Sequence, residues 1–159
     1  MNNNIKLSQQ FINSLSGVQA SQDDVDLLTN KLGEMILPSW FVKLITDFKL
    51  IGSYLFLSEQ YDESEMGVML KWKTPQDMID ELFEYYPGVA VVGMGYLPVG
   101  SCLEGSGDPY FVKLTQEVSD AKFVRIRHDL VEDDDTYLEE EIETVCLNIQ
   151  QFFNNCQVK

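Results

Sequence analysis

The residue best suited to acid–base chemistry is His128, the only histidine in the chain, which Asp129 follows directly. A His–Asp pair acts as a general base when it activates a nucleophile. The nearest hydroxyl and thiol in predicted loops belong to Ser101 and Cys102, and neither lies in a G-x-S-x-G nucleophile elbow. We therefore predict a histidine at the end of a strand and no catalytic residue. An enzyme that uses His128 and Asp129 is kept as an alternative.

Carboxylates are concentrated in one segment, which holds nine acidic residues and no basic residue between Asp129 and Glu143. This segment lacks the glycine and the terminal glutamate of an EF-hand loop, so we predict no calcium site. Two compatible interpretations remain. One is a solvated loop followed by a helix N-terminus, whose dipole favours carboxylates. The other is a docking surface for a basic partner, and the residues predicted to bind that partner are Asp129, Glu132, Asp133, Asp134, Asp135 and Glu139.

Neither a metal nor a nucleotide cofactor is predicted. The three cysteines, Cys102, Cys146 and Cys156, are odd in number and lack the spacing of a zinc site, which favours a reduced, cytoplasmic setting. Val89 to Gly95 begins like a dinucleotide-binding turn, but Pro98 occupies the third glycine position and no helix follows at once. Because a pyrophosphate site needs that helix N-terminus, we predict a bend after a buried strand instead.

The overall charge of the chain favours a basic binding partner over an anionic one. Twenty-six acidic residues against eleven basic ones give a net charge of −15 and a pI near 4.2. Such a field repels nucleic acids and anionic membranes and attracts basic proteins. The uncharged stretch from Tyr85 to Leu103 is interrupted by Pro87, Pro98 and glycines, which favours a buried strand over a membrane span. The first ten residues also lack an apolar signal-peptide core.

Several helices are predicted from their start and stop signals. Ser21 with Asp24 forms a capping box for a helix that ends at Gly33. After Leu37-Pro38 a broad apolar face runs to Phe48, and Thr74-Pro75 starts a helix that stops at Pro87-Gly88. The last predicted helix runs from Leu138 to Asn155, with Leu138, Ile142, Val145, Ile149, Phe152 and Phe153 on its apolar stripe.

The remaining periodicity predicts strands, at Ser53–Ser58, Met66–Lys73, Val89–Met94, Tyr110–Leu114 and Lys122–Arg127. The 159 residues predict a single domain, 1–159, with a short Asn-rich N-terminal tail. The fold class is α+β: a mainly antiparallel sheet of about five to six strands packed against N-terminal, middle and C-terminal helices.

Two motifs together resemble the SUKH superfamily. Tyr96-Leu97-Pro98-Val99-Gly100, then Gly105-Ser106-Gly107-Asp108 and Pro109-Tyr110-Phe111, is similar to its apolar-Pro-apolar-Gly and Gly-x-Gly-Asp pattern. Leu37-Pro38 with the apolar helix behind it resembles an upstream motif. The chain departs from the pattern at Lys49-Leu50 and at Lys113-Leu114, where Asn-Gly and Asp-Leu would stand. The residues predicted to form structural turns are Pro98, Gly100, Gly105, Gly107 and Asp108.

The resemblance implies a function as well as a fold. The superfamily takes in yeast regulators of cell-wall glucan synthesis and many bacterial immunity proteins. It therefore implies a protein that binds and blocks a toxin, often a nuclease, and an acidic inhibitor can occupy the place of phosphates. The alternative is a regulatory scaffold in signalling or cell-envelope control. In either case the expected partner is a protein and not a nucleic acid or a membrane.

Overall fold

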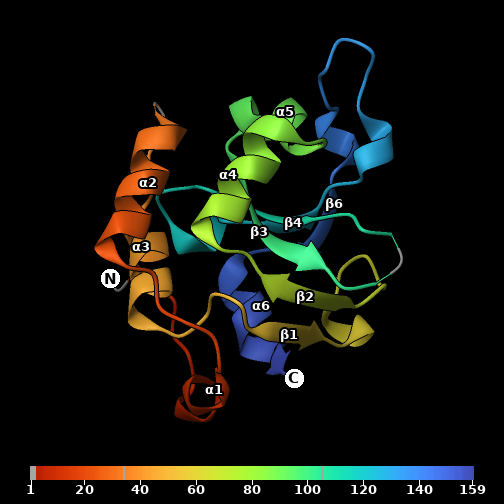
Figure 1. The fold of residues 1–159 in the computed structure, drawn as a ribbon. Helices are drawn as coiled ribbons and strands as arrows, with labels where there is room; N and C mark the ends of the chain where they lie inside the picture. Colours follow the sequence, from red (N-terminus) through yellow and green to blue (C-terminus); the bar gives the residue numbers. More distant parts are fainter. Residues whose placement is uncertain (1–2, 34, 105) are drawn as a thin grey trace.

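The computed structural model describes residues 3–33, 35–104 and 106–159, and its central feature is an antiparallel sheet (Figure 1). Seven strands lie in the order β6-β5-β4-β3-β2-β1-β7. Their bounds are β1 Tyr54–Leu57, β2 Val68–Trp72, β3 Tyr96–Cys102, β4 Tyr110–Lys113, β5 Phe123–Arg125, β6 Glu143–Cys146 and β7 Gln157–Val158. Strands β1 to β6 therefore pair in chain order, and the C-terminal strand joins the free edge of β1.

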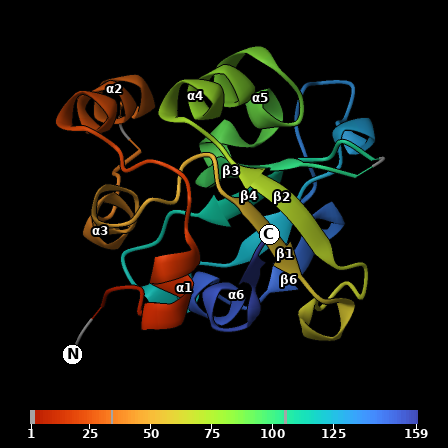
Figure 2. The same ribbon diagram turned by 60° about the horizontal axis from the view of Figure 1, so that its bottom comes forward.

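Six α-helices pack around this sheet, with α4 and α5 on one side and α6 and α1 on the other (Figure 2). Their bounds are α1 Gln9–Ser14, α2 Gln22–Leu32, α3 Ser39–Asp47, α4 Pro75–Glu84, α5 Gly88–Val91 and α6 Ile149–Asn155. Short 3-10 turns cover Glu59–Tyr61, Val92–Met94, Val118–Asp120, His128–Leu130 and Glu139–Glu141. This arrangement confirms the predicted α+β class with a mainly antiparallel sheet. No helix in the described ranges is long and apolar enough to cross a membrane.

Local sequence signals account for the helix starts. Ser21 and Asp24 form the predicted capping box of α2, and Gly33 follows its last residue with φ 59°. The Thr74 side chain accepts a hydrogen bond from the Asp77 amide at the start of α4, with Pro75 in the first turn. The predicted strand pair is also confirmed as β1 and β2, which are antiparallel in the register Leu55–Leu70.

Strands β3 to β5 are buried on both faces because their side chains alternate between two apolar clusters. The larger cluster receives residues such as Leu97 and Phe123, and the ring of Phe123 lies 4.3 Å from that of Phe152 on α6. The smaller cluster lies on the opposite face, against α5 and the acidic segment, and consists of Val91, Tyr96, Phe111, Val124, Ile126 and Tyr137. Burial of both faces explains why these strands read as nearly continuous apolar runs.

A buried arginine joins β5 to distant parts of the chain. Arg125 is 3 % exposed, and its Nη1 lies 3.1 Å from Glu143 Oε2 on β6. Its Nη2 donates to the Gly67 carbonyl at 2.9 Å and lies 3.5 Å from Asp62 Oδ2. The guanidinium also covers the Tyr110 ring, 5.1 Å from its centroid. The charged side chain of Arg125 is therefore enclosed by the fold and lies beside two carboxylates.

Two secondary-structure predictions are wrong. Residues 89–94 were predicted as a strand, but they lie in helix α5 and the following 3-10 turn. Residues 138–155 were predicted as one helix, but they form a 3-10 turn, strand β6 and the short helix α6. Residues 89–92 form a short apolar run, which periodicity alone cannot assign to a strand or a helix. The apolar residues of 138–155 have helical spacing, but residues 143–146 pair with β5 as a strand instead.

The turn predicted at Pro98 and Gly100 is also wrong, because both residues lie inside β3. The pairing register with β4 shifts between them, which is typical of a β-bulge. Glycine at position 100 allows close packing between the strands, because an added Cβ would stand 2.8 Å from Leu70 Cδ2 and would displace that side chain. Gly107 does adopt a positive φ, 70°, in the loop before β4, and Asp108 lies beside it. Gly105 lies outside the described residues.

Candidate protein-binding groove

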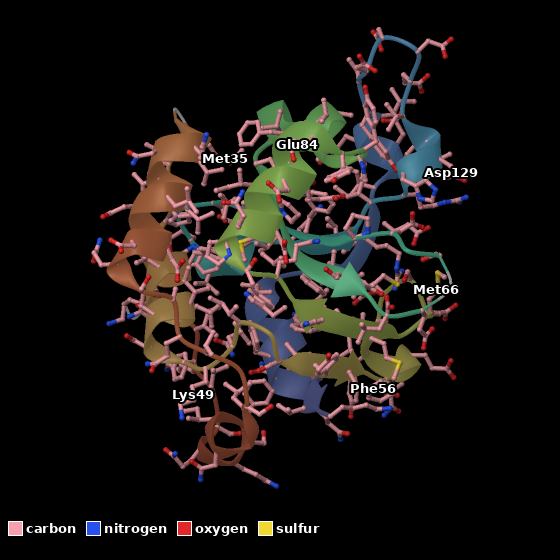
Figure 3. The ribbon with its side chains drawn as sticks, viewed as in Figure 1. Met35, Lys49, Phe56, Met66, Glu84 and Asp129 are labelled. Atoms are coloured by element: carbon pink, nitrogen blue, oxygen red, sulfur yellow. The ribbon has the colours of Figure 1, made fainter. Side chains whose placement is uncertain are left out.

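The acidic segment is fixed to the body of the protein by its apolar residues. Tyr137 is 6 % exposed and belongs to the smaller cluster, and Leu130, Val131 and Ile142 pack against that cluster. Between these anchors, residues 132–135 project from the protein as an acidic loop. Figure 3 shows the loop rising beyond Asp129 with carboxylate oxygens along it. The carboxylates are therefore held at a definite place by residues that carry no charge.

Hydrogen bonds within the acidic loop close it into a tight turn. The Glu132 amide donates to the Thr136 carbonyl at 2.8 Å, and the Asp135 amide donates to the Glu132 carbonyl at 3.0 Å. Asp135 has φ 61°, the left-handed conformation that aspartate tolerates better than most residues. The long helix predicted to begin at Leu138 is absent, and Glu139–Glu141 form a 3-10 turn instead, so an α-helix dipole does not explain those three carboxylates.

An open groove of about 780 Å³ lies between the acidic loop, the end of α4 and the loop before β4. Two kinds of side chain line it. Tyrosine rings and small apolar groups come from Tyr85, Tyr86, Pro109 and Val131, and carboxylates come from Glu81, Glu132, Asp133 and Asp135. Ser106, Gly107 and His128 complete the lining. Among the described residues, no lysine or arginine lines this groove.

The two tyrosines are presented by a close contact between α4 and α5. An added Cβ on Gly88 would stand 1.8 Å from the Glu81 carbonyl oxygen, so only glycine permits this approach. Tyr85 and Tyr86, which connect the two helices, remain 58 % and 46 % exposed. The Tyr86 hydroxyl donates a 2.8 Å hydrogen bond to Asp135 Oδ1, and this bond raises the pKa of Tyr86. The bond joins the aromatic side of the groove to the acidic loop.

His128 meets a different carboxylate from the one predicted. Its Nδ1 lies 2.6 Å from Asp108 Oδ1, and its backbone amide donates to the same oxygen at 3.1 Å. Asp129 instead accepts from Arg127 Nη2 at 3.0 Å, and this bond lowers the pKa of Asp129. His128 and Asp129 begin a 3-10 turn, His128–Leu130, and their side chains bond to different partners. Asp108, predicted only as a turn residue, is the true partner.

The His128–Asp108 pair has no nucleophile bonded to it. Ser106 lines the same groove, but its hydroxyl accepts from the Asp108 amide at 3.3 Å. Within the described ranges, no hydroxyl or thiol hydrogen bonds to the His128 ring. A nucleophile activated by histidine lies within hydrogen-bond distance of it. The geometry therefore supports a polar lining residue of the groove more than it supports a general base.

The predicted partner-binding residues divide into two groups. Glu132, Asp133 and Asp135 line the groove. The other three side chains are engaged outside it: Asp129 with Arg127, Asp134 with the Thr136 hydroxyl, and Glu139 with the Tyr96 hydroxyl at 2.9 Å. Glu139 Oε1 also lies 4.0 Å from Lys113 Nζ. The charge pattern of the sequence did not show which carboxylates line the groove and which bond to residues outside it.

Glu81 is the lining carboxylate that no sequence pattern selects. It lies on α4, about fifty residues before the acidic loop. Its position in that helix matches no binding or catalytic motif. Burial raises the pKa of Glu81, against a smaller lowering by Lys73. Among the described residues, none makes an ion pair within 4.0 Å or a hydrogen bond to its carboxylate. A partly buried carboxylate without a direct partner is a place where an incoming cation would be favourable.

The described residues contain no group of three or more His, Cys, Asp or Glu side chains arranged to hold a metal ion. Comparisons of the chain with protein-family models, with curated proteins and with solved structures find no match. The residues of the groove and the acidic loop are therefore the basis on which a function can be proposed.

Proposed function

We propose that this protein is a binding module that neutralises a basic protein toxin, of the nuclease type, by forming an inhibitory complex. The observation that carries the proposal is the acidic loop, held by the buried Tyr137 anchor beside a groove lined with exposed tyrosines. Aromatic residues are enriched at protein interfaces, and complementary charge raises the association rate and selects partners. The motifs that resemble the SUKH superfamily support an immunity role.

The inhibitory step follows from the chemistry of a nuclease. Such a toxin binds phosphates with lysine and arginine, so an acidic surface competes for the same groups. The net charge of −15 makes the long-range attraction strong at low salt. Carboxylates presented on a closed turn lose little conformational freedom when they bind, which favours affinity.

The direct experiment is capture of the toxin encoded beside this gene, followed by measurement of Kd across a range of salt concentration. We expect tight binding that weakens as salt rises. The variant Glu132→Gln/Asp133→Asn removes two groove carboxylates, and we expect it to weaken binding at least tenfold. The matched control, Glu59→Gln/Asp120→Asn, removes two exposed carboxylates from 3-10 turns elsewhere in the chain. Its net charge equals that of the groove variant.

The outcomes separate the rival roles. Equal weakening by both double variants would show that only net charge matters and would count against this surface. A housekeeping protein captured at the same surface, with no affinity for the adjacent toxin, would favour the regulatory scaffold. Failure of the toxin to bind at any salt concentration would overturn the immunity role.

A further inference from the structure

We propose that the groove between Tyr85, Tyr86 and the acidic loop receives an arginine side chain of the partner protein. The inference rests on the proposed function, because it names the group by which a basic partner would be held. The guanidinium would lie against the tyrosine rings while its N–H groups face the carboxylates. Each part of this description follows from a separate feature of the groove.

The first feature is the aromatic surface. Tyr85 and Tyr86 are 58 % and 46 % exposed, so both side chains are accessible to a partner. A planar guanidinium stacks on such a ring through cation–π attraction. An ammonium group gains from the same attraction but has no flat face to stack.

The second feature is the set of carboxylates. Glu81 lies on the α4 side of the groove, and Glu132 and Asp133 lie on the acidic loop. Asp135 is partly satisfied by Tyr86, whereas Glu81 has no direct partner among the described residues. A guanidinium offers five N–H donors in a fixed fork and can reach carboxylates on two sides. No lysine or arginine of the described chain lines the groove to compete with it.

The third feature is a precedent within the same molecule. Arg125 lies over the Tyr110 ring and contacts the carboxylates of Asp62 and Glu143. That internal site combines one aromatic face with two carboxylates from separate segments. The groove offers the same combination of aromatic rings and carboxylates on the surface. His128, the histidine in the lining, already bonds to Asp108.

The test uses the full chain and a small probe, N-acetyl-arginine methylamide, in an NMR titration of the backbone amides. We expect saturable shifts at residues 81–86, 106–108 and 128–135, and none on α1 or α6. The lysine analogue should bind at least threefold more weakly, and the neutral citrulline analogue should not bind.

Two variants with matched controls locate the site. Tyr85→Ala and Glu81→Gln should each weaken the probe at least threefold. Tyr54→Ala removes an exposed tyrosine from β1, and Glu84→Gln removes a carboxylate from the exposed side of the same helix, so both should leave binding unchanged. Amide spectra of each variant check that the fold is retained.

The inference is overturned if citrulline binds as well as arginine, if lysine binds equally, or if Tyr85→Ala and Glu81→Gln behave as their controls. These results are independent of the toxin. Salt-sensitive toxin binding without arginine binding would leave the proposed function standing and reject the groove inference. Arginine binding without any toxin complex would support the groove inference and reject the proposed function.

Discussion

His128 Nδ1 lies 2.6 Å from Asp108 Oδ1, and the same carboxylate oxygen accepts the His128 backbone amide at 3.1 Å. One carboxylate thus joins the loop before β4 to the turn after β5. Asp108 is 6 % exposed, whereas the His128 side chain is 58 % exposed. The buried aspartate therefore holds the pair in place, and loss of the exposed histidine ring should disturb the structure less than loss of the aspartate.

Asp108→Ala should destabilise the protein by about 1–3 kcal/mol, because it leaves the His128 amide without its acceptor. His128→Ala should cost less, since the backbone bond to Asp108 survives. Urea unfolding of both variants measures the difference. An equal cost for the two would show that the ring contact, and not the backbone bond, dominates.

Arg125→Met should destabilise the protein by about 3–5 kcal/mol, because it leaves the buried Asp62 carboxylate without its cation. Arg127→Met, two residues after the end of β5, is the matched control. Its ion pair with Asp129 is about half exposed, so its removal should change the stability little. The free energy of unfolding in urea gives both values. A small effect at Arg125 would mean that Asp62 is better solvated than its burial indicates.

Gly88→Ala should cost at least about 1–3 kcal/mol, since the new Cβ would overlap the Glu81 carbonyl. It should also shift the amide signals of Tyr85 and Tyr86. Gly93→Ala is the control, because nothing lies within 4 Å of its added Cβ. Thermal unfolding and amide spectra follow both effects. A Gly88→Ala variant as stable as Gly93→Ala would contradict the close approach of α4 and α5.

Thiol reactivity should distinguish Cys102 from the other two cysteines. Cys146 and Cys156 are 2 % and 7 % exposed, while Cys102 is only partly buried. Burial also raises the pKa of Cys146 to about 12, so its thiol stays protonated near neutral pH. At pH 8 a colourimetric thiol reagent should react rapidly with one group in the folded protein and with three in denaturant. Rapid reaction of two or three groups in the folded protein would be the contrary result.

Alkaline pH should weaken the anchor of the acidic loop. Burial raises the pKa of Tyr137 to about 12 from its ordinary value of 10.0. The contribution of the neutral phenol to stability is present below about pH 10 and is lost as pH rises through about 12. Tyr137→Phe should reduce the loss of stability between those pH values. At pH 7 this variant should be nearly neutral, because within the described residues the buried hydroxyl lacks a well-formed hydrogen bond.

The contrasting variant is Tyr96→Phe, which removes the donor of the 2.9 Å bond to Glu139. It should cost about 0.5–1.5 kcal/mol or more at pH 7. Unfolding measured at pH 7 and again between pH 10 and 12 separates the two tyrosines. An unchanged alkaline loss in Tyr137→Phe would assign that loss to other groups.

Features that depend on residues close together in the chain could be predicted from the amino-acid sequence. The Ser21–Asp24 capping box and Thr74-Pro75 start helices because a side chain meets an amide three residues away. The pairing of β1 with β2 follows from adjacent β-rich runs joined by a polar loop. The concentration of charge between Asp129 and Glu143 is also a property of the sequence.

Features that depend on contacts between residues far apart in the chain could not be predicted and are seen in the folded structure. The apolar run at residues 89–92 fits a strand or a helix, and packing on the sheet makes it α5 with its 3-10 turn. Gly100 remains in β3 because Leu70 of the neighbouring strand fills the space beside it. His128 bonds to Asp108 rather than to Asp129, and Glu81 joins the acidic loop in one groove. Long-range packing, which no local pattern encodes, chose these partners.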